Sequence, residues 1–460
     1  MQIKGINTSL NSFELYTLFK DHSYSFFLDS GMDQEKLGRY SFIGFDPFMN
    51  FKSQGEKITI YKNGRAEESC GNPFARLQEI LSLYKMDYET ELPFIGGAVG
   101  YLGYDLCRHL EDLPNSALDD IQLPDCYFGF YDGVIVIDHL LHEVFLAALG
   151  IKQREEDNIA YMEEIIRQGE AKVIKAALPV KPASYIQSNL TKAEYMQAVK
   201  RIKKYIRAGD IYQANMTQRF CCEVKARPYD IYAKLRDINP APFSAFIDFQ
   251  EGHIACSSPE RFLKIKGRYI ETRPIKGTCP RGKTPEQDNL LAQDLLASEK
   301  NRSELLMIVD LERNDLGKIA KTGTVKVTEL FHLESYPTVH HLVATIIAEI
   351  DQRFDVIDCL KAMFPGGSIT GAPKIRAMEI IDELEPTARN IYTGSIGFIG
   401  FNGDADLNIA IRTIVCKDQK AYLQVGGGIV WDSVADQEYQ ETLDKAKAMM
   451  EVLLNTPINA

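Results

Sequence analysis

The order of strand-like and helical segments limits the fold of this chain more than any other feature. Roughly the first 145 residues are rich in short β-like runs, such as YSFFLDS (24–30), KITIYK (57–62) and YDGVIVID (131–138), separated by glycine, asparagine and proline. Later strand-like runs are interleaved with helical patterns, but not in the regular β-α-β alternation of a Rossmann or TIM fold. The sequence therefore predicts an α+β fold with antiparallel sheets.

The composition changes between residues 151 and 190. A charged helical stretch, KQREEDNIAYMEEIIRQGEAKVIKAA (152–177), is followed by the polar, proline-bearing segment LPVKPASYIQSN (178–189). We predict an N-terminal region at 1–150, a linker at 151–190 and a catalytic domain at 191–455. The last of these should begin with a helix that Thr191 caps and Gly209 ends.

Charge and composition exclude several classes of function. The formal net charge is −12, which disfavours nucleic acid as a partner. No stretch approaches the ~18 apolar residues of a membrane span, and the first residues do not resemble a signal peptide. We expect a soluble, cytoplasmic protein. Its nine cysteines form no C-x-x-C pair and none lies in a G-x-C-x-G context, so we expect reduced thiols and no glutamine amidotransferase nucleophile in this chain.

Two glycine-rich segments could approach an anion closely. PGGSITGAPKIRAME (365–379) runs into a helix whose start would present free N–H groups, but Lys374 does not complete a P-loop. Gly426, Gly427 and Gly428 lie in a strand-like setting that also fits a bulge. Arg412 stands in an apolar run, where an internal salt bridge and a carboxylate-binding role are equally compatible with the sequence.

Several acidic and ionisable residues are candidates for chemistry. In the last helix, Glu438 and Glu441 fall on one face away from the apolar residues, which alone indicates a solvated surface. The helix that carries Glu304 could bring this residue opposite Glu441 and form an oxygen-rich Mg²⁺ site. Glu260 and His341 lie in mixed apolar contexts, where an ordinary hydrogen-bonded residue is the more common case.

The chain resembles the chorismate-utilising enzymes in nine motifs that occur in this order: GRYSFIG (38–44), GDIYQANMTQRF (209–220), SSPERF (257–262), PIKGT (274–278), RSELLMIVDLERNDLG (302–317), PGGSITGAPKIRAMEIIDELEP (365–386), IYTGSIGF (391–398), IAIRT (409–413) and GGGIVWDS (426–433). The resemblance implies two packed antiparallel β-sheets with helices outside, and chorismate as substrate. It also implies how the substrate is bound. Glu304 and Glu441 would hold a Mg²⁺ ion that binds the ring carboxylate. The enolpyruvyl carboxylate would be bound by Arg412, Tyr392 and Gly426–Gly428. Lys445, Thr278 and Ser368 would complete the anion shell, and His341 matches an active-site histidine of the family.

Lys276 in PIKGT indicates the branch of the family. The resemblance implies alanine there in anthranilate-forming enzymes and often lysine in aminodeoxychorismate-forming ones, where the amine attacks the ring. Glu260 matches the general acid of the family. Gln213 stands where water-using members have a lysine base, and an amide cannot deprotonate water. We therefore expect ammonia as nucleophile, from a separate amidotransferase subunit.

Two other functions stay open at this stage. The first is an anthranilate-forming enzyme, and the second is a non-catalytic tryptophan-binding or regulatory subunit. Residues that resemble the tryptophan pocket of some relatives are Ser30, Tyr40, Ser41, Phe42, Ile43, Pro242, Phe243 and Ser244. Glu260, Lys276, Glu304 and Glu441 are all present, which argues against an inactive chain.

Overall fold

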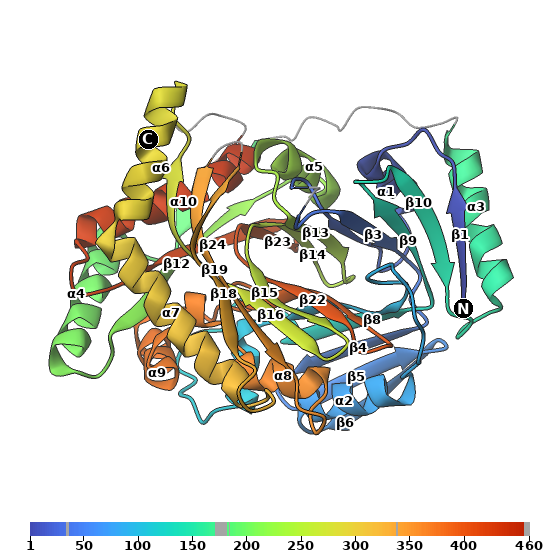
Figure 1. Cartoon of the computed structure of the whole chain (residues 1–460), viewed down its shortest axis with the longest axis horizontal. Coiled ribbons are helices and arrows are strands. Elements are labelled where there is room, and N and C mark those ends of the chain that lie inside the picture. Colours follow the sequence, from blue (N-terminus) through green and yellow to red (C-terminus); the bar gives the residue numbers. More distant parts are fainter. Residues whose placement is uncertain (34–35, 171–181, 184, 337–338, 455–460) are drawn as a thin grey trace.

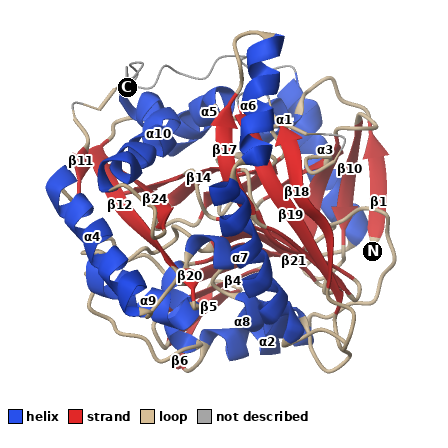
Figure 2. Cartoon of the chain, turned by 60° about the vertical axis from the view of Figure 1, so that its left-hand side comes forward, coloured by secondary structure: helices blue, strands red, loops and turns tan. Residues whose placement is uncertain are grey.

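A computed structural model describes residues 1–33, 36–170, 182–183, 185–336 and 339–454. In this part of the chain, two twelve-stranded sheets pack together and helices cover their outer faces (Figures 1 and 2). Every strand pairing within the sheets is antiparallel. The predicted α+β class with two antiparallel sheets is confirmed.

The first sheet contains, in spatial order, β1 (Gln2–Ile6), β10 (Glu143–Ala148), β9 (Gly133–Asp138), β3 (Tyr40–Gly44), β2 (Phe26–Asp29), β13 (Phe243–Asp248), β14 (His253–Ser258), β23 (Thr413–Lys417), β24 (Lys420–Ile429), β12 (Gln213–Glu223) and β11 (Gln187–Ser188), with β20 (Gly371–Ala372) on β12. The second contains β17 (Ile275–Pro280), β19 (Val339–Glu349), β16 (Tyr269–Arg273), β15 (Arg261–Lys266), β22 (Ala405–Ile409), β21 (Ser395–Gly400), β7 (Gly97–Leu102), β8 (Cys126–Tyr131), β4 (Met49–Gln54), β5 (Lys57–Lys62) and β6 (Arg65–Cys70), with β18 (Lys326–Ser335) on β19.

The helices are α1 (Ser12–Phe19), α2 (Pro73–Leu83), α3 (Glu155–Glu170), α4 (Lys192–Ala208), α5 (Pro228–Ile238), α6 (Pro285–Ala297), α7 (Glu299–Gly317), α8 (Val356–Met363), α9 (Lys374–Leu384) and α10 (Ala435–Leu454), with short 3₁₀ turns η1 (Tyr104–His109) and η2 (Gly367–Ile369). The predicted start and end of α4 are confirmed. Thr191 accepts a hydrogen bond from the Glu194 amide, and Gly209 ends the helix with a φ of 84°.

Both sheets contain strands from before and after the predicted boundary. The first runs from β1–β3 directly into β13 and β14, and the second runs from β21 into β7 and β8. Of the predicted linker, α3 and β11 are described, whereas residues 171–181 and 184 lie outside the described residues. The N-terminal strands and the C-terminal strands thus share hydrogen-bonded sheets, and the three-part division stays a prediction.

The main apolar core lies between the two sheets. Phe42 on β3 meets Phe398 on β21 with ring centroids 5.4 Å apart, and Phe94 stacks on Phe398 at 4.5 Å. Such aromatic pairs add about 0.5–1.5 kcal/mol each beyond the area they bury. A second core lies on the outer face of the first sheet, under α1, α3, α5 and α10. Among the described residues, no helix is long and apolar enough to cross a membrane.

A buried ion pair holds the segment that follows α9. The Arg389 guanidinium contacts both Glu385 carboxylate oxygens, at 2.8 and 2.9 Å, and both side chains are at most 3% exposed. Arg389 also donates to the carbonyls of Asn215 (2.7 Å) and Ile369 (3.0 Å). The pair therefore fixes the position of Tyr392, three residues further along the chain.

We expect Glu385→Ala to lower the free energy of unfolding by about 3–5 kcal/mol, because it leaves the Arg389 charge buried without its partner. The control is Glu383→Ala in the last turn of α9, two residues earlier, which breaks an ion pair with Arg201 at the surface and should cost under about 1 kcal/mol. Urea unfolding of both variants measures the difference. Equal losses in the two variants would contradict the assignment.

Candidate active site

Lys276 meets residues from two other parts of the chain. It lies on β17, and its Nζ donates a hydrogen bond to the Ser368 carbonyl of η2 at 2.7 Å. The neighbouring Ile275 amide donates to Glu260 Oε1 at 3.3 Å. Withdrawal from water lowers the pKa of Lys276, although the charges of Glu304 and Glu260 oppose this effect. A lysine amine of lowered pKa is a more available nucleophile.

Glu260 is suited to donate a proton. Its side chain is buried, with 5% exposed, just after β14. Burial raises the pKa of this carboxyl, and the hydrogen bond with Ser368 and the charge of Lys276 only partly offset the rise. A carboxyl of raised pKa stays protonated at a pH where an ordinary glutamate is ionised, which is the property of a general acid.

Three carboxylates gather where α7 and α10 meet. Lys300 Nζ lies 4.0 Å from Glu304 Oε1 and 3.8 Å from Glu438 Oε1, so these two glutamates face each other across α7 and α10. Glu441 is one turn from Glu438, and a Cβ placed on Gly427 would lie 3.3 Å from Glu438 and 3.5 Å from Glu441. Glu304 therefore lies near the face of α10 that carries Glu438 and Glu441, and a Mg²⁺ ion held by Glu304 and Glu441 stays a prediction.

We call Glu304, Glu438 and Glu441 the carboxylate cluster, and two of its members, Glu304 and Glu441, are the predicted Mg²⁺ ligands. Glu304 Oε1 is buried and has no hydrogen-bond partner, and carboxylate oxygens are the ligands that Mg²⁺ prefers. Burial raises the pKa of Glu304 and of Glu438. Among the described residues, no group of three or more histidine, cysteine, aspartate or glutamate side chains is arranged so that it could hold a metal ion by itself. An ion here would need further oxygen ligands from substrate or water.

Glu438 is the residue of this cluster that the sequence analysis did not assign. The helical spacing of Glu438 indicated a solvated face, but only 4% of this residue is exposed. It is covered by α7 and by the turn that precedes α10. Glu441 is 48% exposed and pairs with Lys445 at 2.6 Å. Burial acts to raise the pKa of Glu441, but Lys445 holds it below the usual value.

Arg412 and His341 lie near each other and differ in charge. Arg412 Nη1 donates to the Lys445 carbonyl, and in the described chain no carboxylate lies within ion-pair distance of its guanidinium. The internal salt bridge that the sequence left open is therefore absent there. Burial and the charge of Arg412 lower the pKa of His341 to about 4, so this imidazole is neutral at pH 7. His341 Nδ1 lies 2.8 Å from Thr278 Oγ1.

The glycines of β24 permit close backbone approach. Gly426 and Gly428 pair with β12, where a Cβ would meet the Met216 carbonyl at 2.5 Å and the Gln213 amide at 2.1 Å. The pairing of β24 with β23 stops at Leu423, so β23 does not pair with the second edge of Gly426–Gly428. Lys445 Nζ donates to the Gly426 carbonyl at 2.8 Å, and Gln213 Oε1 is buried without a partner.

Tyr392 and Lys374 have different environments. Tyr392 is buried beside Arg389, and burial raises the pKa of its phenol. The charge of Arg412 acts to lower the pKa of Tyr392, so the two side chains lie near each other. Lys374 donates to Asp315 and to the Met363 and Pro365 carbonyls. Its amine is therefore used to anchor the start of α9 and does not serve as a phosphate lysine.

The residues predicted to bind tryptophan come together near one end of β2, β3 and β13. Ser30 Oγ donates to the Tyr40 carbonyl at 2.6 Å and to the Pro242 carbonyl at 3.5 Å, and the Ser30 amide donates to Ser41 Oγ at 3.0 Å. Ile43 and Ser244 are buried in the same region. Tryptophan binding there stays a prediction.

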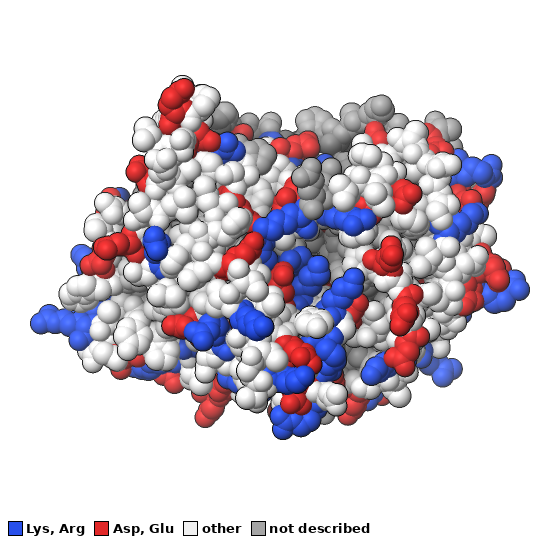
Figure 3. Space-filling view, in the orientation of Figure 1, with Lys and Arg blue, Asp and Glu red and all other residues white. Residues whose placement is uncertain are grey.

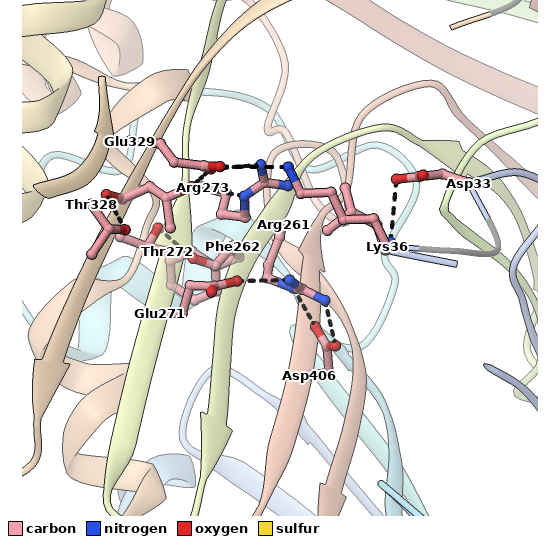
Figure 4. Close-up of polar contacts among 12 residues, drawn as sticks. Asp33, Lys36, Arg261, Phe262, Glu271, Thr272, Arg273, Thr328, Glu329 and Asp406 are labelled. Carbon is pink, nitrogen blue, oxygen red and sulfur yellow. Dashed lines mark hydrogen bonds and ion pairs between the residues drawn. The ribbon is translucent and has the colours of Figure 1, made fainter. Parts of the chain in front are cut away.

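A network of charged side chains connects the loop after β2 to the second sheet (Figure 4). Lys36 lies 3.1 Å from Glu334 and 3.7 Å from Glu329, and Arg273 contacts the same two glutamates at 2.7 and 3.3 Å. Basic side chains border the hollow at the middle of the face in Figure 3. Glu334 also accepts from the Tyr336 hydroxyl, and the Tyr336 ring contacts His341.

Glu312 on α7 is a further buried carboxyl that the sequence analysis did not single out. It accepts a hydrogen bond from Thr272 Oγ1 at 2.9 Å, and burial raises its pKa to about 8. The folded chain therefore holds a proton here that the unfolded chain loses above its ordinary pKa of 4.5. Its contribution to stability falls as the pH rises from about 4.5 to 8.

Glu312→Gln imitates the neutral acid and should remove this pH dependence. We expect the variant to melt higher relative to the wild type at pH 8 than at pH 5, since only the wild type must ionise a buried group. Melting temperatures at the two pH values measure the double difference. A double difference of zero, or of the opposite sign, would show that Glu312 is not a buried neutral acid.

Comparisons with known proteins identify the family of this chain. A family model for chorismate binding enzymes matches residues 23–451. The chain is 41% identical over 456 residues to anthranilate synthase component 1 of Acetivibrio thermocellus, covering 95% of this chain and 92% of that protein. It is 39% identical over 426 residues to aminodeoxychorismate synthase component 1 of Bacillus subtilis, covering 92% and 91%.

Solved structures show the same fold. Anthranilate synthase component I from Streptococcus pneumoniae superposes with a TM-score of 0.80 at 35% identity, covering 90% of this chain and 92% of that one. The menaquinone-specific isochorismate synthase from Escherichia coli gives a TM-score of 0.72 at 17% identity, over 98% and 94%. Since the family model and these relatives span nearly the whole sequence, the chain belongs to the chorismate-binding enzymes.

Proposed function

We propose that this chain converts chorismate and ammonia to 4-amino-4-deoxychorismate. The observation that carries the proposal is the position of Lys276, whose amine lies among Ser368, Glu260 and Glu304 with a lowered pKa. An alanine at this position could not supply a nucleophile. Relatives named aminodeoxychorismate synthase component 1 match over more than nine-tenths of the chain.

The proposed reaction consists of two allylic displacements. The neutral Lys276 amine forms a bond to ring C2, the ring double bond shifts, and the C4 hydroxyl leaves as water with a proton from Glu260. Ammonia then forms a bond to C4, the double bond shifts back, and the C2–Nζ bond breaks to return the neutral lysine amine. The ammonium formed at C4 gives one proton back to Glu260. The net change replaces the C4 hydroxyl by an amino group.

The surrounding residues support binding of a dianionic substrate. Arg412, without a carboxylate partner in the described chain, and the Gly426–Gly428 backbone offer donors for the enolpyruvyl carboxylate. The carboxylate cluster would hold Mg²⁺, which when bound supplies positive charge for the ring carboxylate. Neutral His341 and Thr278 would contribute polar contacts without a further charge.

The direct test is to incubate the purified chain with chorismate, Mg²⁺ and ammonium salts and to identify the product by mass spectrometry. Treatment with aminodeoxychorismate lyase should convert the product to 4-aminobenzoate. Anthranilate is the competing product, because relatives named anthranilate synthase component 1 match at similar identity. Anthranilate as the sole product would overturn the proposal.

We expect the isolated chain to use ammonia but not glutamine, because it contains no amidotransferase cysteine motif. Turnover should rise with ammonium concentration at fixed chorismate, whereas glutamine alone should give no product. Adding a separate glutamine-hydrolysing subunit should restore glutamine-dependent turnover. Robust use of glutamine by the chain alone would reveal a second active site and contradict this expectation.

A further inference from the structure

A group of exposed apolar side chains lies where β12 begins and β24 ends. Tyr212, Trp431, Val434 and Ile375 are 72%, 54%, 51% and 44% exposed, and we call them the aromatic patch. Trp431 is the only tryptophan of the chain. Exposed tryptophan and tyrosine side chains are enriched in protein interfaces, where they act as anchors.

Strand register and one backbone hydrogen bond place Tyr212 near Trp431 and near the segment that carries Ile375. Ala214 pairs with Ile429, so Tyr212 and Trp431 lie opposite each other just beyond the paired ends of β12 and β24. The Tyr212 amide donates to the Ala372 carbonyl at 2.7 Å, three residues before Ile375. Segments far apart in the sequence therefore contribute to one surface.

A stripe of basic residues on α4 borders this patch. Lys200, Lys203, Lys204 and Arg207 follow the spacing i, i+3, i+4 and i+7, which places them on one face of the helix. Lys203 Nζ lies 5.6 Å from the Trp431 ring centroid, which joins the stripe to the patch. In the described chain, the other three have no acidic partner. This basic stripe is a local concentration of positive charge on a chain of net charge −12.

The aromatic patch is one residue away from the candidate active site. Tyr212 and Gln213 follow each other at the start of an extended strand, so their side chains point to opposite sides. Tyr212 is 72% exposed, whereas Gln213 is 1% exposed and its Oε1 has no partner. A molecule bound on the patch would thus contact the start of β12 from outside. The same stretch of backbone carries Gln213, whose Oε1 is a free hydrogen-bond acceptor on the inner side.

We propose that the aromatic patch and the basic stripe form the docking surface for a glutamine-hydrolysing subunit that presents acidic groups around an apolar socket. The inference rests on the proposed function, which requires ammonia that this chain cannot produce. Ammonia donates hydrogen bonds, and the Gln213 oxygen would accept one at the point of entry. The apolar anchors would supply affinity, and the basic stripe would steer an acidic surface.

The test uses the full chain and a purified glutamine-hydrolysing subunit from the same organism. Lys200→Glu/Lys204→Glu reverses two charges of the stripe, and Trp431→Ser removes the central anchor. We expect each variant to weaken the complex tenfold or more and to lower glutamine-dependent turnover in proportion. Turnover with ammonium should stay within about twofold of the wild type, and melting temperatures report whether each variant is folded.

The matched control is Lys85→Glu/Lys266→Glu, which makes the same change in charge after α2 and at the end of β15. Unchanged affinity in both stripe and anchor variants, or equal loss in the control, would overturn the docking surface. A homodimer of this chain that dissociates only in the stripe and anchor variants would also overturn it. The ammonium reaction tests the proposed function separately, because its product is identified without the partner.

Discussion

Turnover of Glu304→Gln is expected to fall at least about 100-fold. Its Mg²⁺ affinity should also fall, by about 10–100-fold or more, because loss of a residue that only supports a metal ligand already has an effect of that size. The substitution keeps the shape of the side chain but removes the negative charge of a carboxylate whose buried Oε1 has no hydrogen-bond partner. A neutral amide also places an N–H₂ donor toward any cation. The change therefore tests the carboxylate cluster with little change in packing.

Two measurements separate loss of metal from loss of chemistry. Mg²⁺ raises the melting temperature of a chain that binds it only when folded, so a titration without chorismate reports affinity directly. The turnover assay with chorismate and ammonium is independent of that readout. The matched control is Glu299→Gln, which makes the same change at an exposed position of the first turn of α7 and should leave both unchanged.

Glu441→Gln should have a similar effect on turnover and additionally release Lys445 from its 2.6 Å ion pair. Because burial raises the pKa of Glu304, wild-type Mg²⁺ affinity should decline with falling pH sooner than an ordinary glutamate would cause. Full activity and an unchanged Mg²⁺ requirement in both the Glu304 and Glu441 variants would refute the metal assignment.

Local signals in the sequence were sufficient for the elements, but not for every contact between them. Thr191 and Gly209 bound α4 because a cap and a left-handed residue act within one turn of the chain. The absence of β-α-β alternation likewise predicted antiparallel sheets, since alternation is a property of neighbouring segments. Which strands join across the predicted boundary is set by long-range packing, and no local pattern encodes it.

The candidate site shows the same division. The family motifs predicted that Glu304 and Glu441 lie close together, whereas the helical spacing predicted that Glu438 is solvated. Glu438 is instead buried by α7 and by the turn that precedes α10, and the periodicity of α10 alone does not show this. Arg412 left two possibilities open for a related reason. Only the arrangement of its neighbours shows that, in the described chain, the guanidinium of Arg412 donates to a carbonyl and has no carboxylate partner.

Lys276→Ala is expected to reduce formation of 4-amino-4-deoxychorismate by at least about 100-fold, the lower end of what a positioned catalytic group supplies. The variant loses the amine that would attack C2 and opens space for ammonia at that carbon. Some anthranilate-like product could then form, because alanine is the residue that the resemblance associates with that branch. Lys276→Met fills the same space without an amine and should lose activity without this new product.

The alternative is that Lys276 only attracts the negatively charged substrate. Such a clamp would act equally on the ground state and the transition state, so the alanine variant would show mainly a raised KM and little change in kcat. Lys283→Ala, an exposed lysine beyond β17, controls for loss of one positive charge. Mass spectrometry of wild type incubated with chorismate and no ammonia decides between the two. An adduct on Lys276 supports nucleophilic attack, whereas no adduct together with a KM-only variant would reduce this lysine to an electrostatic contact.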